Sequence, residues 1–346
     1  MTQSFQPVAL QIGDVTVPGN VLLAPMTGVT DLPFRRAASR LGAPYVATEM
    51  VACAELARGR PDVVRRAAVG EGLPLMVVQL VGHDPRWIAE GARMAEASGA
   101  DIVDLNMGCP AKEVTGCASG SALMRDLDQA ERLLDAAVGA TSRPVTLKMR
   151  LGWDDASRNA PELAARAERA GVKAVTVHGR TRQQFYTGRS DWAAIAAVRA
   201  ATGLPVIVNG DIVDIASARG AMAASGADGV MIGRGVYGRP WIAAHLQAVL
   251  AGGGEMEEPG PAERLVIVLE HFRDSLRFYG DALGLKIFRK HLGWYVETAP
   301  WPASAEARRA AKARLCRLDR PAEIEAALGA LWGAGLGLES STLRAA

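Results

Sequence analysis

The 346-residue sequence has few cysteines, no long apolar run and little net charge, and each shortage excludes a class of protein. Four cysteines in so long a chain cannot form a disulfide scaffold, so we expect free thiols and a reducing, cytoplasmic setting. The uncharged apolar runs are too short to cross a bilayer, and the N-terminus lacks the basic-then-apolar pattern of a signal peptide. The cysteines also lack the close spacing of a zinc site. We therefore expect a monomeric protein with no membrane anchor and no metal.

The small net charge of +2 conceals a basic segment. Residues 261–320 hold twelve Lys and Arg against seven Asp and Glu, a local balance of +5. The rest of the chain is mildly acidic. Such a segment favours an anionic partner such as nucleic acid, although a solvated helical face would have the same composition.

Short apolar runs rich in β-branched residues recur along the first 240 residues. Runs without polar alternation are typical of strands buried on both faces, as in a parallel sheet covered by helices. Between them lie Ala-rich stretches with helix starts, such as Asp31 with Pro33 and Asp84 with Pro85. The predicted strands are Val21–Ala24, Tyr45–Thr48, Leu75–Gln79, Ile102–Asn106, Val145–Met149, Ala174–His178, Val206–Asn209 and Gly229–Ile232.

The segments before these strands repeat in pairs. Every second strand follows a similar glycine-containing segment (LGAPYV, SGADIV, AGVKAV, SGADGV), and most of the others follow a proline. Eight strand–helix units with a paired repeat predict an α/β fold of the closed (β/α)8 (TIM) barrel type, with an open doubly wound sheet as the alternative.

The composition changes after the last predicted strand. Residues 251–261 read as a linker, and helix-periodic segments rich in Arg and Lys follow at Glu263–Tyr279, Leu283–Val296 and Ala303–Arg317. We therefore expect a catalytic barrel over residues 1–250, a small all-helical domain over 251–335 and a tail over 336–346.

Polar residues collect where the predicted strands end. Catalytic residues of (β/α)8 barrels lie at the carboxyl ends of the strands, so ends carrying amide, thiol, amine, imidazole and guanidinium groups predict one site. These residues are Pro25, Met26, Thr27, Gln79, Asn106, Cys109, Lys148, His178, Arg180, Asn209, Gly210, Asp211, Gly233 and Arg234.

Their chemistry favours a phosphorylated cofactor. Glycines after the last two strands let backbone N–H groups approach a phosphate, and Arg234 adds a bidentate partner, although the glycines could simply make tight turns. Lys148 would stabilise the pyrimidine edge of a reduced flavin, with a Schiff-base lysine as the alternative. Gln79 and Asn106 can pair with a flavin or a uracil, and His178 is either a site residue or a structural histidine.

Two loops complete the predicted site. Cys109 would carry an ordinary thiol that stays protonated at neutral pH, which suits a proton donor. The Gly- and Ser-rich residues 112–120 after it read as a mobile lid. The segment from His178 to Trp192 mixes Arg180 and Arg182 with Tyr186, which suits phosphate contact and base stacking, with a cofactor clamp as the alternative.

Six motifs together resemble one family, the tRNA-dihydrouridine synthases, and in particular the bacterial DusB-type branch. The likeness runs from about Leu23 to Trp241 and continues more weakly in KIFRKHLGWY. Other flavin-binding barrels share the phosphate loops but lack the combination of the second and fourth motifs. The motifs are LAPMTGVTDLPFR, DLNMGCPAKEV, LKMRLGW, HGRTRQQFYTGRSDW, VNGDI and GRGVYGRPW.

The resemblance implies a flavoenzyme that reduces the C5=C6 bond of particular tRNA uridines, with NADPH or NADH recharging FMN. Hydride would pass from FMN N5 to C6 and a proton from Cys109 to C5. Asn106, Arg180, Arg182 and Tyr186 would contact the substrate, and Lys286, Arg289 and Lys290 would hold tRNA. The implied FMN-binding residues are Pro25, Met26, Thr27, Gln79, Lys148, His178, Asn209, Gly210, Asp211, Gly233 and Arg234.

Two alternatives remain at the level of sequence. A flavin-dependent reductase of a free pyrimidine or another small metabolite would have the same barrel, but the basic helical segment would have no role. A non-catalytic RNA-binding barrel would use that segment, but it would need neither Cys109 nor Lys148.

Overall fold

The computed structural model describes residues 9–70, 73–254, 256–300 and 304–334, which form two compact units. One unit comprises Met1–Gly235 with Trp241–Gly254, and the other comprises Val236–Pro240 with Glu255–Ala346. The predicted tail, residues 336–346, lies outside the described residues. No described helix is both long and apolar enough to cross a membrane.

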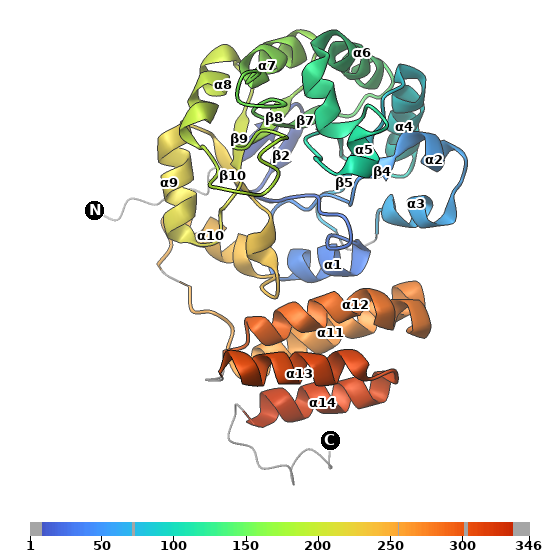
Figure 1. Cartoon of the computed structure of the whole chain (residues 1–346), viewed down its shortest axis with the longest axis vertical. Helices are drawn as coiled ribbons and strands as arrows, with labels where there is room; N and C mark the ends of the chain where they lie inside the picture. Colours follow the sequence, from blue (N-terminus) through green and yellow to red (C-terminus); the bar gives the residue numbers. More distant parts are fainter. Residues whose placement is uncertain (1–8, 71–72, 255, 301–303, 335–346) are drawn as a thin grey trace. The chain divides into compact units, whose positions relative to one another are not determined.

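The first unit is a barrel of eight parallel strands in the order β3-β10-β9-β8-β7-β6-β5-β4, with helices around it (Figure 1). A parallel bridge between Leu23 and Val46 joins the two ends of this sheet. The predicted (β/α)8 barrel is therefore confirmed. Its strands are β3 (Val21–Leu23), β4 (Val51–Ala52), β5 (Val77–Val81), β6 (Ile102–Met107), β7 (Val145–Arg150), β8 (Ala174–His178), β9 (Val206–Asn209) and β10 (Gly229–Ile232).

The second predicted strand is the one that differs most from the structure. Where Tyr45–Thr48 was expected, only isolated bridges at Val46 and Ala47 occur, and β4 begins later. The side chain of Thr48 explains the interruption, because its hydroxyl accepts a hydrogen bond of 3.0 Å from the backbone N–H of Gln79. The Thr48 side chain thus accepts from a backbone N–H that, in a regular strand pair, would donate to a backbone carbonyl.

Helices of the first unit begin where the sequence indicates. Asp31 caps α1 by accepting from the N–H of Phe34 at 3.0 Å, and Asp84 caps α4 by accepting from that of Arg86 at 2.8 Å. Helix α9 ends at Gly226, whose φ of 63° favours glycine. The helices are α1 (Leu32–Arg40), α2 (Cys53–Ala57), α3 (Pro61–Arg66), α4 (Pro85–Ala97), α5 (Lys112–Thr115), α6 (Leu127–Val138), α7 (Ala160–Arg169), α8 (Ala196–Ala201), α9 (Ile215–Ser225) and α10 (Ile242–Leu250), with short 3-10 turns η1 (Gly120–Arg125), η2 (Ala193–Ile195) and η3 (Arg234–Val236).

An antiparallel hairpin that the sequence did not indicate precedes the barrel. It pairs β1 (Leu10–Ile12) with β2 (Val15–Val17). Its apolar side chains share one buried cluster with barrel residues such as Tyr45 and Met231. The hairpin therefore contributes to the barrel's core, away from the strand ends that carry the polar residues.

The second unit is helical, as predicted, and its described residues include one helix more than the three expected. Helix α11 (Pro261–Tyr279) packs on α12 (Asp281–Glu297) and α14 (Pro321–Ala334), and α12 also packs on α13 (Ala305–Arg317). Their shared core includes Phe272, Phe288, Leu292 and Trp332. This core gives α12 and α13, which carry many of the basic residues, a fixed framework.

Candidate functional site

Five strands bring the predicted polar residues to one end of the barrel. In the ladder Gln79 pairs with Asp104, Asn106 pairs with Lys148, and His178 pairs with both Arg150 and Asn209. Because parallel strands keep one direction, residues paired in this way lie side by side at the same edge. Strands β5 to β9 thus place the predicted amides, amine and imidazole together.

Gln79 and Asn106 belong to a buried chain of hydrogen bonds. Asn106 donates to the Gln79 side-chain oxygen at 2.8 Å, and Gln79 donates to the Asp104 carboxylate at 2.6 Å. Thr146 donates to the other oxygen of Asp104 at 2.7 Å. Burial raises the pKa of Asp104 to about 6, against the opposing effect of these hydrogen bonds. The chain fixes the amide plane of Asn106; direct pairing of Gln79 with a cofactor stays a prediction.

Asn106 in turn positions Cys109. The Asn106 side-chain oxygen accepts from the N–H groups of Gly108 at 3.1 Å and Cys109 at 2.9 Å. On the other side, the hydroxyl of Ser121 donates to the Cys109 carbonyl at 2.8 Å. Gly120 allows this close approach, since a Cβ there would lie 2.8 Å from the Cys109 oxygen. Backbone contacts on both sides therefore hold the thiol in place.

The environment of Cys109 favours the protonated form of its thiol. The residue is partly exposed, and burial raises the pKa of its thiol, although the positive charges of Arg150 and Lys148 act in the opposite direction. A raised thiol pKa leaves the protonated form dominant at neutral pH. The raised pKa therefore favours a protonated thiol, rather than a reactive thiolate, at the barrel mouth.

Lys148 is held by an amide from a neighbouring strand. Its ammonium donates to the Asn209 side-chain oxygen at 3.0 Å, and the Asn209 amide donates to the Met231 carbonyl at 2.7 Å. Burial, together with the nearby charge of Arg150, lowers the pKa of Lys148 to about 8. At neutral pH this amine is therefore a cation, but one that gives up its proton within the alkaline range.

Arg150 is a site residue that the sequence reasoning missed. Its side chain is buried and donates to the carbonyls of Gly108 at 2.8 Å, Thr181 at 2.9 Å and Phe185 at 2.8 Å. It thereby ties the cysteine loop to the segment after β8. The motif LKMR contained the signal, because residues two apart on a strand share a face, so Arg150 accompanies Lys148.

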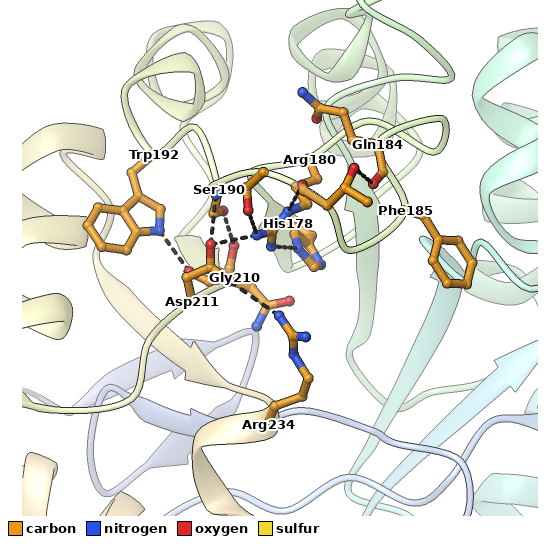
Figure 2. Close-up of polar contacts among 12 residues, drawn as sticks. His178, Arg180, Gln184, Phe185, Ser190, Trp192, Gly210, Asp211 and Arg234 are labelled. Carbon is orange, nitrogen blue, oxygen red and sulfur yellow. Dashed lines mark hydrogen bonds and ion pairs between the residues drawn. The ribbon is translucent and has the colours of Figure 1, made fainter.

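Arg180 ties down the loop between β8 and η2 (Figure 2). The residue is only 1% exposed. Its guanidinium donates to the carbonyls of Thr187 at 3.0 Å and Gly188 at 2.7 Å and to the carboxylate of Asp211 at 2.6 Å. Since these donors are used within the protein, the structure gives Arg180 a positioning role. Its predicted contact with substrate stays a prediction.

His178 lies among four positively charged side chains. Burial, together with the charges of Arg150, Lys148, Arg180 and Arg234, holds the pKa of His178 well below its usual value. The imidazole is therefore neutral at physiological pH. This concentration of positive charge favours an anionic ligand.

The end of the site near β9 and β10 suits a phosphate. Asp211 binds Arg234 at 3.4 Å and accepts from the N–H of Ser190 at 2.8 Å (Figure 2). Burial would raise the Asp211 pKa, but the hydrogen bonds from Arg180 and Ser190 outweigh it and the pKa is lowered. A Cβ on Gly233 would meet only the Met26 sulfur, at 3.9 Å. The open backbone there and the half-exposed Arg234 could hold a phosphate group.

The remaining predicted residues lie on the loop after β8 or in the other unit. Arg182 and Tyr186 are on the loop after β8, where Tyr186 stacks over the guanidinium of Arg150 at 5.4 Å and that of Arg234 at 5.2 Å. Lys286, Arg289 and Lys290 are on α12, and the first two are exposed. Among the described residues no group of three or more His, Cys, Asp or Glu could hold a metal ion.

Fold and site together define a (β/α)8 barrel enzyme with an electropositive mouth and a protonated thiol at its rim. The sequence model of the family described as Dihydrouridine synthase (Dus) matches residues 22–327. The chain belongs to this family, which confirms the resemblance noted in its motifs.

Curated relatives carry the same family name. A probable tRNA-dihydrouridine synthase of Rhodobacter capsulatus is 56% identical over 84% of this chain and 90% of its own length. One of Rhizobium leguminosarum is 50% identical over 91% of this chain and 95% of its own length. The tRNA-dihydrouridine synthase B of Pseudomonas putida is 44% identical over 84% of this chain and 87% of its own.

Two solved structures share the fold at low sequence identity. Histamine dehydrogenase from Rhizobium sp. 4-9 is 11% identical with a TM-score of 0.55, over 78% of this chain and 51% of that one. A 2-naphthoyl-CoA reductase complex is 12% identical with a TM-score of 0.56, over 73% and 53%. At these identities the likeness concerns the barrel fold alone.

Proposed function

We propose that this protein is a tRNA-dihydrouridine synthase that uses FMN, recharged by NADPH or NADH, to reduce the C5=C6 bond of specific uridines. The observation that carries the proposal is the position of Cys109, whose loop Asn106 holds near Lys148 and Arg150 and whose thiol pKa is raised by burial. Its support also comes from membership of the family and the names of the curated relatives. An enzyme with a tRNA substrate would work in the cytoplasm.

The residues of the barrel mouth fit FMN. Gly210, Gly233 and Arg234 would hold its phosphate, and Lys148 would lie toward its ring, with Pro25, Met26, Thr27, Gln79, His178, Asn209 and Asp211 around it. When bound and reduced, the flavin supplies the hydride that uracil C6 receives. Lys148, whose ammonium donates to Asn209, would stabilise the negative charge of the reduced flavin.

Cys109 would complete the reduction. Its sulfur–hydrogen bond breaks as a carbon–hydrogen bond forms at C5, and the thiolate then regains a proton from solvent. Asn106 would orient the uracil, and its amide plane is fixed by Gln79 and by the backbone of the cysteine loop. Since a stacked base cannot reach this rim, the uridine must leave the stack, and Tyr186 and Arg182 would hold the extruded strand.

The direct test is the formation of dihydrouridine in tRNA. Unmodified tRNA, incubated with flavin-loaded protein and NADPH, should gain two mass units at one or a few uridines, located by digestion and mass spectrometry. Reduction of free uridine or uracil without reduction of tRNA would favour the metabolic reductase. Binding of tRNA with no flavin and no reduction would favour a non-catalytic RNA-binding protein.

We propose a division of labour in which residues 1–250 catalyse and residues 251–335 bind tRNA. Lys286, Arg289 and Lys290 lie three and four residues apart on α12, a spacing that places them on one side of the helix. Replacing all three with glutamine should reduce the slope of log K against log salt by about two to three units, because each phosphate contact releases counterions. Titration with tRNA at several salt concentrations measures this slope.

The triple variant has two internal controls. Its flavin content and its helical circular dichroism should match those of the wild type, since these side chains are absent from the core of the second unit. Parallel titration lines of equal slope would show that this side of α12 does not contact tRNA phosphates.

A further inference from the structure

A cavity of about 460 Å³ lies beside the cysteine loop. It is lined by Ala111, Lys112 and Glu113 from the cysteine loop and by Arg182 and Phe185 from the loop after β8. Its volume is in the range of about 300–1,000 Å³ that small ligands occupy. It is therefore large enough for a single nucleotide.

The cavity adjoins the proton donor. Ala111 follows Cys109 by two residues, so it lies at most about 7 Å from it along the chain. On the opposite side, Arg150 donates to the carbonyl of Phe185 and to that of Gly108. The same guanidinium thus fixes the distance between the cavity's aromatic wall and the loop that carries the thiol.

Phe185 is held in a costly conformation that keeps its ring exposed. Its φ is 53°, in the left-handed region, which is a genuine outlier for a bulky side chain. Two hydrogen bonds maintain that conformation: the N–H of Phe185 donates to the carbonyl of Arg182, and the carbonyl of Phe185 accepts from the guanidinium of Arg150. The residue is 44% exposed, and Figure 2 shows its ring turned away from the cluster of His178 and Asp211. Backbone strain of this kind concentrates at ligand-binding sites.

The charges in the cavity favour a phosphate. Lys112 is exposed, and Arg182 lies with its guanidinium 5.0 Å from the centre of the Trp153 ring, which fixes its plane. Its Nε is buried and makes no hydrogen bond within the described part of the chain. Glu113 is the single acid in the lining. An exposed aromatic ring and two cations lining one cavity are the combination that binds one base and its phosphate.

We propose that this cavity binds the nucleotide directly adjacent to the reacting uridine in tRNA, with its base stacked on Phe185 and its phosphate between Lys112 and Arg182. The proposal rests on the proposed function. Binding the neighbouring nucleotide fixes the RNA backbone next to the extruded uridine. It also makes recognition depend on a base that takes no part in the reaction.

A double-mutant cycle between protein and tRNA tests the stacking. Once the reduced uridine is located, tRNAs are assembled with an abasic ribose at its 5′ or its 3′ neighbour. Phe185→Ala should lower kcat/KM on intact tRNA by roughly 5- to 150-fold, the usual range for one base stacked on an aromatic ring. On the tRNA that lacks the stacked base, the same substitution should change kcat/KM by less than about twofold.

Matched variants separate stacking from damage to the loop. Phe185→Tyr keeps the ring and the Cβ, so it should retain activity within about twofold. Val64→Ala removes another exposed apolar side chain, on α3, and should change nothing. Equal losses of Phe185→Ala on intact and on both abasic tRNAs would overturn the proposal. If the wild type forms no dihydrouridine in any tRNA, the proposed function fails first and this subsite fails with it.

Discussion

Replacing Cys109 with alanine should abolish most uridine reduction, by at least about 100-fold, while the protein stays yellow with bound flavin. The reason is the thiol's position and protonation. Asn106 and Ser121 fix its backbone, and burial raises the pKa of its side chain, so in the proposed mechanism it would be the acid at the barrel mouth. Single-turnover reduction of tRNA, with NADPH-driven flavin reduction measured separately, checks the result.

The pH dependence follows from the same raised pKa and from that of Lys148. A proton donor is active in its acid form, and Lys148 acts as a cation whose pKa is about 8. Turnover should therefore be level through neutral pH and fall in the alkaline range, as first Lys148 and then the Cys109 thiol, whose pKa is raised by burial, lose their protons. Cys117→Ala is the matched control, because this exposed thiol lies eight residues away and makes no side-chain bond within the described structure. Near-normal turnover by Cys109→Ala would exclude it as the acid.

Replacing Arg150 with methionine should reduce kcat by about 100-fold, although this side chain transfers no proton. The buried guanidinium holds three carbonyls, of Gly108, Thr181 and Phe185, and misplacement of a reacting group by about 1 Å can cost that much. Arg150→Lys should recover little, since an ammonium cannot reproduce the fork of donors. Single-turnover kinetics measures both variants.

A second measurement distinguishes positioning from general destabilisation. The charge of Arg150 lowers the pKa of Cys109, so Arg150→Met should move the alkaline limb of the pH–rate profile to higher pH, and Arg150→Lys should leave it near the wild type. Arg93→Met, on the exposed side of α4, is the control for loss of an arginine. An unshifted limb together with a normal kcat would mean that Arg150 supports the fold alone.

The barrel and its rim could be predicted because both follow from local signals. Strands β8, β9 and β10 begin and end where the apolar runs do, and the caps at Asp31 and Asp84 are residues of the expected type. The rule that barrel chemistry lies at strand ends then located most of the site. None of these inferences required knowledge of how distant residues meet.

The features that were missed depend on distant contacts. Asp104 bonds to Gln79 and Thr146, which are 25 and 42 positions away in sequence, and nothing in the local sequence indicates such pairings. The sequence shows Arg150 only as one more basic residue, because the three carbonyls that it binds belong to other segments of the chain. The β1–β2 hairpin has strands of three residues, which is too short for periodicity to be visible.

The protonated state of Cys109 also bears on how the protein would withstand oxidants. Peroxides attack the thiolate, and a low thiol pKa is what makes a cysteine sensitive to them. Because burial raises the pKa of Cys109, little thiolate is present at neutral pH. The burial that would retain a proton for uracil should therefore also slow conversion of this thiol to sulfenic acid. A thiol that gave up and regained its proton in every cycle would then be chemically durable between cycles.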